Sequence, residues 1–249
     1  MGGLDKGLAR ATGLEVAFQV EIDPFCRRVL AARFPGVPQH DDIRTFRVAA
    51  FPRASVICGG FPCTDLSVAG KQAGLSGARS GLWYEFYRVV KEALSLSKPI
   101  LVIENVAHGW KQWVPFVRSD LGQIGYASVP LQLSAAEVGA PHERRRIFIV
   151  SAPADSHGER LRHLAERFTS RRSNAVRGQR EDEPRHYGSP RVTPRSSAWP
   201  DRPELFRVDD ELPHRLDRRR ALGNAVVPRC AEVIGSAIVS AGLLHDPTF

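Results

Sequence analysis

The chain has 249 residues, of which 43% are hydrophobic and 25% charged, so it can form one domain with a substantial core, or one domain that carries an insert. No apolar run approaches the ~18 residues that a membrane-spanning helix requires, and the N-terminus has no apolar stretch behind a basic start, so we expect no secretory signal, no membrane partner and a cytoplasmic protein. The formal net charge of +8 favours a polyanionic partner, although a solvated basic surface would account for the same excess.

Short apolar segments alternate with longer amphipathic segments from the N-terminus to about residue 152. This alternation is typical of an α/β fold in which helices cover both faces of a mostly parallel sheet. The predicted strands are 15–20, 55–58, 99–103, 127–133 and 146–151. Helices are predicted at 24–34, which a proline opens, and at 82–94, where apolar residues recur at helical spacing.

A polar segment interrupts this pattern between about residues 154 and 213. From Ala154 to Pro200 it holds ten arginines and no lysine against six acidic residues. So polar a segment has little to bury, and we expect a small irregular insert that either recognises the substrate or is a surface insert of no consequence. An apolar helical pattern returns at 222–244. The sequence therefore predicts a core at 1–153, a recognition insert at 154–213 and a C-terminal segment at 214–249 that packs back against the core.

The first candidate site follows the predicted strand 55–58, where two glycines lead into Pro62-Cys63. A thiol just beyond the carboxyl end of a sheet strand lies where open α/β folds bind their ligands. This placement favours a reactive Cys63, although a lone cysteine is more often a buried structural residue. Cys58, inside the apolar run, is expected to be a small packed residue. The four cysteines form no CxxC pair and no zinc-ligand spacing, so we expect free thiols and no metal site.

Two further strands carry polar residues at the same predicted edge. The apolar run 99–103 delivers Glu104 and Asn105, and a carboxylate at the end of a buried strand is costly unless it has a partner or a task. Arg144 and Arg146 directly precede the apolar run 147–150. A nucleophile, an acid and two cations are therefore predicted to converge at one edge of the sheet.

These segments, taken together and in this order, resemble the cytosine-5 DNA methyltransferase family. The nucleophile block and the loop after it are matched by Gly60-Phe61-Pro62-Cys63 with Ser67, Gly70, Gly74, Arg79 and Gly81-Leu82. The other matching blocks are Glu104-Asn105-Val106, the Arg144 and Arg146 pair of a Gln-x-Arg-x-Arg motif in which His142 replaces glutamine, and Gly223-Asn224-Ala225-Val226-Val227-Pro228.

The resemblance implies a Rossmann-like, S-adenosylmethionine-dependent methyltransferase that acts on carbon 5 of a cytosine flipped out of double-stranded DNA. Cys63 would add to ring carbon 6 and Glu104 would hold or protonate ring N3. Arg146 and Arg144 would neutralise charge at the ring carbonyl or flanking phosphate and keep Glu104 in place. The glycine- and serine-rich loop 64–81 would close over the substrate, unless it is merely flexible.

The resemblance also implies a pocket for S-adenosylmethionine. Glu21 would accept hydrogen bonds from the ribose, as acidic residues do in nucleotide-binding α/β folds, and Asp42 would lie near the adenine amino group. Without the resemblance, both carboxylates are equally well explained as surface acids. The other residues that the resemblance places around the cofactor are Gly2, Gly3, Ile22, Ile43, Pro62, Leu82, Asn224 and Ala225.

The sequence departs from the family at its N-terminus. The family opens with a strand and a Phe-x-Gly-x-Gly-Gly turn, whereas this sequence begins at Met1-Gly2-Gly3. We therefore expect a fold without its first strand, which leaves neighbouring sheet edges unpaired. We also expect Met1 to be an internal methionine of a longer product.

Three interpretations of the function stay open at this point. The first is a DNA methyltransferase that works as a monomer on double-stranded DNA, with a cognate restriction endonuclease as a partner by genome association only. The second is a non-catalytic DNA-binding or partner protein derived from the same fold. The third is a cytosine-5 methyltransferase that acts on transfer RNA.

Overall fold

The computed structural model describes residues 1–50, 53–62, 81–177 and 223–244. Their strands form two sheets. The larger one has the order β3-β4-β6-β5, and the smaller one pairs β1 with β2. The strands of both sheets are β1 (Gln19–Val20), β2 (Gln39–His40), β3 (Val56–Gly60), β4 (Ile100–Val106), β5 (Tyr126–Ser134) and β6 (Arg145–Pro153).

The larger sheet is mixed. Strand β3 runs parallel to β4, whereas β6 is antiparallel to both β4 and β5. Three of its four strands share one direction and β6 alone is reversed, so one pairing is parallel and two are antiparallel, where the sequence predicted a mostly parallel sheet. The reversal places the N-terminal end of β6 beside the C-terminal end of β4, at the same edge of the sheet as the C-terminal end of β3.

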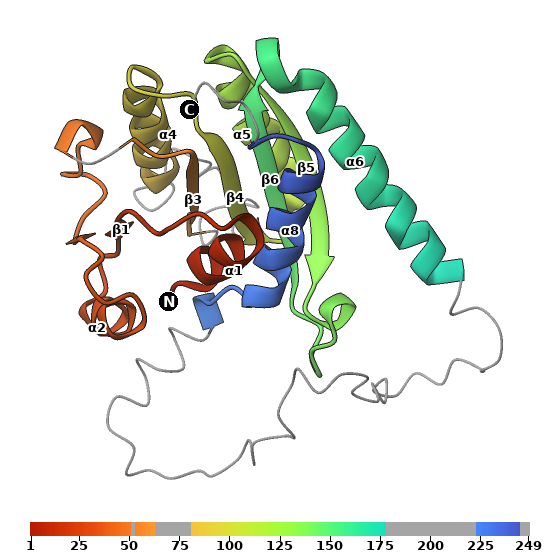
Figure 1. Cartoon of the computed structure of the whole chain (residues 1–249), viewed down its shortest axis with the longest axis horizontal. Helices are drawn as coiled ribbons and strands as arrows, with labels where there is room; N and C mark the ends of the chain where they lie inside the picture. The colour runs from red at the N-terminus through yellow and green to blue at the C-terminus, as the bar shows by residue number, and fades with distance from the viewer. Residues whose placement is uncertain (51–52, 63–80, 178–222, 245–249) are drawn as a thin grey trace, which may run out of the picture.

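Helices cover both faces of this sheet, as predicted (Figure 1). One face carries α1 (Gly3–Thr12), α6 (Ala154–Arg177) and α8 (Pro228–Ser240), and the other carries α4 (Gly81–Leu94) and α5 (Trp110–Gln123). Helix α2 (Pro24–Arg33) lies beside the β1–β2 sheet, and its N-terminus is capped by the side chain of Asp23, which accepts a hydrogen bond from the Cys26 amide.

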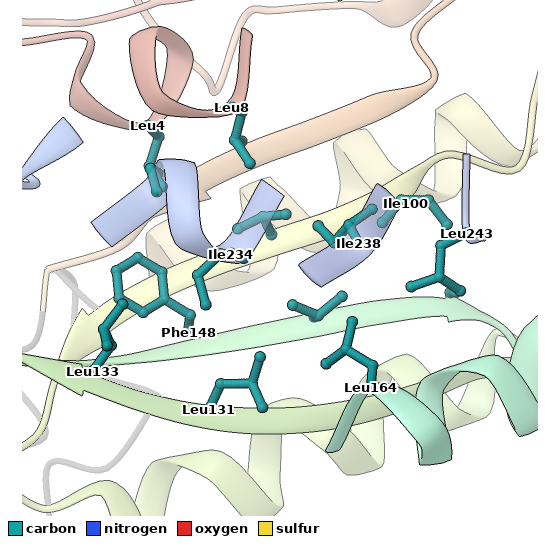
Figure 2. Packing of buried hydrophobic residues seen from close by; sticks show 14 of the residues in the cluster. Leu4, Leu8, Ile100, Leu131, Leu133, Phe148, Leu164, Ile234, Ile238 and Leu243 are labelled. Carbon is teal, nitrogen blue, oxygen red and sulfur yellow. The ribbon is translucent and has the colours of Figure 1, made fainter. Parts of the chain in front are cut away.

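Alternation of side chains along β4 builds the core on both faces. Ile100 and Val102 pack in one cluster, and Leu101 and Ile103 in the other. Because both faces are buried, β4 is a continuous apolar run in the sequence. Figure 2 shows the first cluster, in which leucines from α1 and isoleucines from α8 meet the side chains of β5 and β6.

Helix α8 packs closely against α1, so residues from the two ends of the chain lie side by side (Figure 1). The contact requires a small residue at Gly7. A Cβ atom there would lie 2.2 Å from the Pro228 carbonyl oxygen and 2.5 Å from the Ala231 Cβ. Both distances are shorter than real Cβ contacts, so the two helices approach this closely because residue 7 has no side chain.

Helix α6 corrects the expectation of an irregular insert from residue 154. The structure has 24 helical residues, Ala154–Arg177, because the sparse apolar side chains fall on one helical face. His157, Leu161 and Leu164 are buried, and Phe168 packs against the same cluster. The rest of the predicted insert lies outside the described residues.

The two sheets are joined by side chains. In the described part of the chain, no strand pairs with β3 on the side away from β4. Asp5 of α1 accepts a hydrogen bond from Gln19 Nε2 in β1, at 2.8 Å, and another from the Cys58 thiol in β3, at 3.5 Å. Val20 and Ile57, one from each sheet, pack against the same cluster around Phe46. The connection is therefore one carboxylate and an apolar contact.

Candidate active site at the edge of the sheet

Glu104 and Arg146 form an ion pair where β4 ends and β6 begins. The strand register places Arg146 opposite Val106, two residues beyond Glu104. Arg146 Nε lies 2.8 Å from Glu104 Oε1, and the side chains are 17% and 12% exposed. The convergence of these two residues, expected from the sequence, is therefore present as a largely buried pair.

The environment of Glu104 makes its carboxyl group easier to protonate than a carboxyl group in water. Burial raises the pKa of this carboxyl group above its usual value, against the opposing effect of the Arg146 and Arg144 guanidinium groups. A carboxyl group whose pKa moves toward neutrality can donate a proton or a hydrogen bond to a ring nitrogen. The pair is therefore suited to general acid chemistry.

Strand β3 reaches this pair through Gly60. Gly60 lies opposite Glu104 in the parallel register, and a Cβ atom on it would lie 2.9 Å from the Glu104 carbonyl oxygen and 3.2 Å from Glu104 Oε2. A larger residue would therefore press on the carboxylate. Of the two glycines singled out in the sequence, Gly60 serves this close approach, whereas Gly59 leaves room for the Phe86 ring, which would lie 2.9 Å from a Cβ atom there.

Asn105 fixes the chain just after β3. Its Nδ2 donates to the Phe61 carbonyl oxygen at 3.1 Å, and the Phe61 ring packs against Trp83 and Trp113, with centroids 5.5 and 6.0 Å away. The sequence indicates no role for Asn105 beyond its place beside Glu104 at a strand end. Pro62 follows, exposed, as the last described residue before a gap.

Cys63 and the loop to Ser80 lie outside the described residues. The three cysteines that the structure does describe are held as thiols. Burial raises the pKa of Cys26 and of Cys230 to about 11, and burial together with the Asp5 carboxylate raises the pKa of Cys58 well above its usual value. A thiol with a raised pKa is a poor nucleophile at neutral pH.

Arg144 has different partners from Arg146. Its Nη2 donates to the carbonyl oxygens of Gly223, at 2.7 Å, and of Ala225. Its φ of 36° is in the left-handed region that favours glycine. Arg144 therefore ties the start of β6 to the segment that returns to the core before α8. Sequence reasoning, which gave the two arginines one joint role, had no signal for this contact across some eighty positions of the chain.

The residues expected around a cofactor fall into two groups. In the first, Gly3 approaches the segment after Asn224 and Ala225, since a Cβ atom on Gly3 would lie 2.1 Å from the Val226 carbonyl oxygen. Gly2 has φ +68°, and a Cβ atom there would lie 2.5 Å from the Phe34 ring. Packing within the protein is therefore sufficient reason for both glycines.

The second group lies where the parallel strands β1 and β2 end. Glu21 follows β1, and its Oε1 accepts a hydrogen bond from the Asp23 amide at 2.9 Å. Ile22 is 63% exposed, which is unusual for a large apolar side chain. Asp42 follows β2 and is bound by the guanidinium of Arg44, whose hydrogen bonds lower the Asp42 pKa to about 2.

This second group has the chemistry of a nucleoside site. It combines two carboxylates, as acceptors for hydroxyl or amino groups, with an exposed apolar side chain that an aromatic base can cover. Ile43 is half-buried behind them and packs against Phe46. Leu82 lies in the first turn of α4, half-buried.

In the described ranges no three His, Cys, Asp or Glu side chains are grouped as metal ligands, and no helix there is both long and apolar enough to cross a bilayer.

Comparison with known proteins shows what the chain is similar to. A family model described as C-5 cytosine-specific DNA methylase matches residues 1–204. The chain is 31% identical to Type II methyltransferase M2.BsuMI of Bacillus subtilis over 157 residues, which are 61% of the chain and 40% of that protein. It is 28% identical to Type II methyltransferase M.HhaI of Haemophilus parahaemolyticus over 155 residues, which are 60% of the chain and 46% of that protein.

The chain thus spans less than half the length of these two curated relatives. Among solved structures, the S. pombe Dnmt2 methyltransferase superposes with a TM-score of 0.51 at 20% identity, over 61% of this chain and 47% of that one. At this identity the likeness shows the fold alone.

Proposed function

Because the chain belongs to the C-5 cytosine-specific DNA methylase family, we propose that it transfers a methyl group to carbon 5 of a cytosine in double-stranded DNA, through a temporary covalent bond to Cys63. The observation that carries the proposal is the buried ion pair between Glu104 and Arg146 at the sheet edge to which β3 leads. This edge holds the acid and the cation that addition to a pyrimidine ring requires.

In the proposed reaction, the Cys63 thiolate adds to ring carbon 6, and the electron pair displaced from the ring bond is delivered toward carbon 5. Glu104 donates a hydrogen bond or a proton at ring N3, which gains electron density as the sulfur adds. Arg146 holds Glu104 and faces the negative charge that develops at the ring carbonyl. Once carbon 5 carries the methyl group, whose bond to the cofactor's sulfur has broken, loss of the carbon 5 proton to a base returns electrons to the ring and expels the Cys63 thiolate.

The cofactor, S-adenosylmethionine, supplies an electrophilic methyl group when it is bound. The residues present fit its nucleoside part. Glu21 has a carboxylate that can accept from ribose hydroxyls, and Ile22 exposes an apolar surface for adenine. Asp42, whose oxygens accept from Arg44, would have to release one of these bonds to accept from the adenine amino group. We propose that Gly2, Gly3, Pro62, Leu82, Asn224 and Ala225 complete this pocket.

The target base has to leave the duplex to meet Glu104, at a cost of a few kcal/mol. We propose that the loop 64–81 closes over the flipped base, and that the segment 154–213 supplies contacts to DNA from its arginines. The net charge of +8 supports a nucleic-acid substrate, because counterions are released when phosphates are neutralised.

The test is transfer of a labelled methyl group by the purified full chain to duplex DNA and, separately, to transfer RNA. We expect incorporation into DNA, its loss in Cys63→Ser, and its retention in Cys26→Ser, a matched control in which a buried thiol far along the chain is changed. Incorporation only into transfer RNA would show that the same reaction takes place on RNA and not on DNA. DNA binding without incorporation into either would favour the non-catalytic interpretation.

A further inference from the structure

The segment between β2 and β3 is held against α4 by one arginine. Arg88 Nη2 donates to the carbonyl oxygen of Ile43 at 2.6 Å, and its Nη1 donates to that of Phe46 at 3.1 Å. These carbonyl groups belong to the chain that directly follows Asp42. The guanidinium therefore fixes the backbone at the point where the proposed adenine side of the pocket is built.

Arg88 is itself held in orientation by two acids of the same helix. Its Nε lies 2.8 Å from Glu85 Oε2, one turn earlier, and Nη1 pairs with Glu92 Oε1, one turn later. Glu92 also accepts a hydrogen bond from the Val48 amide at 3.2 Å through its other oxygen. The helix thus presents a planar fork that is already oriented toward two carbonyl groups.

The bulk of the segment has a second, apolar attachment. Phe46 and Val48 are buried and pack against Val89 and Ala93 of α4. This contact holds the segment near the helix even without the guanidinium, whereas the position of the Ile43 carbonyl depends on Arg88. Loss of Arg88 should therefore shift the backbone at residues 42 and 43 without unfolding the domain.

We infer that Arg88 is a positioning residue that sets the adenine side of the S-adenosylmethionine pocket through the Ile43 and Phe46 carbonyl groups. This inference rests on the proposed function, since it takes Asp42 and Ile43 to contact adenine. It also explains why the residue is arginine. Lysine keeps the charge but, as a single ammonium on a flexible stem, cannot fill four directed contacts at once.

The experiment compares Arg88→Lys and Arg88→Gln with Lys91→Ala in the full chain. Lys91 is exposed on the same helix, 5.8 Å from the Tyr87 ring, and is the matched control for loss of a cation. Binding of S-adenosylhomocysteine and of adenosine is measured by calorimetry, and steady-state kinetics give KM for cofactor and for DNA and kcat. Melting temperatures show whether each variant is folded.

For Arg88→Lys we expect binding of both ligands to weaken about tenfold, KM for the cofactor to rise about as much, and kcat and KM for DNA to stay within twofold of wild type, because the lost interaction is uniform binding. Lys91→Ala should match wild type. Equal weakening of the two ligands assigns the loss to the adenosine part that they share, and an unchanged KM for DNA separates this loss from a general loss of stability.

Wild-type affinity in both Arg88 variants, or the same loss in Lys91→Ala, would overturn the inference. A loss that follows only the melting temperature, with KM for DNA changed equally, would also overturn it. Failure of the proposed function looks different: the wild-type chain itself would then bind neither ligand and would transfer no methyl group.

Discussion

Replacement of Arg146 by methionine tests the electrostatic account of the sheet edge directly. The substitution keeps much of the side-chain volume and removes the charge 2.8 Å from Glu104 Oε1. With an effective dielectric constant of ~20, Coulomb's law gives about 6 kcal/mol for two charges at this separation. Part of this attraction offsets desolvation of the pair, and breaking a buried pair by removing one partner costs about 3–5 kcal/mol in practice.

The destabilisation by Arg146→Met should increase with pH. Burial already raises the pKa of Glu104, and Arg146 opposes that shift, so the folded-state pKa rises further in Arg146→Met. A carboxyl group with a raised folded-state pKa favours folding while it is protonated, and that contribution is lost as pH rises through the folded-state value. The variant should therefore be near wild type at pH 4 and most destabilised at pH 8.

The assay is urea unfolding at both pH values, with Glu104→Gln and the double variant to complete a cycle. At pH 8 we expect Arg146→Met to lose about 3 kcal/mol, or roughly 6–12 °C in Tm for a chain of this size. The double variant should recover most of the loss, because no charge is left buried. Equal destabilisation at both pH values, or no recovery in the double variant, would refute the electrostatic reasoning and leave packing as the cause.

Three other predictions concern chemistry and packing. Duplex DNA with 5-fluorocytosine at the target base should trap the wild-type chain as an adduct that survives denaturing electrophoresis, because fluorine is not lost from carbon 5 as a proton is. Cys63→Ala should give no such band. Glu104→Gln should lower kcat at least ~100-fold, as expected for loss of a general acid, while calorimetry shows unchanged cofactor affinity; equal kcat would remove Glu104 from the mechanism. Gly7→Ala should cost about 1–3 kcal/mol of unfolding free energy because the added methyl group meets α8. Gly158→Ala, in open space on α6, should instead stabilise the protein by ~0.5–1 kcal/mol. Chemical denaturation of both variants measures the two changes.

Apolar pattern and strand ends were sufficient to mark Glu104 and Arg146 as polar residues at the ends of buried strands, but not to place them at the same edge of the sheet. The run before Glu104 was continuous because both faces of β4 are buried, and Arg146 led directly into an equally continuous run. Glu104 lies near the end of β4 and Arg146 near the start of β6, so the ion pair forms only because β6 runs antiparallel to β4. The predicted role of Cys63 stays a prediction, because it lies outside the described residues.

Other features depend on interactions that a local pattern does not record. Alternation of side chains is the same in either strand direction, so the reversal of β6 had no signal in the sequence. Helix α6 was missed because four positions, from His157 to Phe168, bury its face while the composition around them is polar. Of the predicted strand 15–20, only Gln19 and Val20 pair, because a ladder needs a partner and β2 supplies two residues.

The link that Asp5 makes between the two sheets bears on how the protein unfolds locally. Four paired residues make up the β1–β2 sheet, and side chains link it to the larger one. The amide protons of Gln19 and Glu21, which are donated to the carbonyl oxygens of Pro38 and His40, should therefore exchange with solvent by a local opening that leaves those of Val102 and Ile149 protected. The part of the protein that holds Glu21 and Asp42 can then open locally, while the sheet that holds Glu104 and Arg146 stays folded.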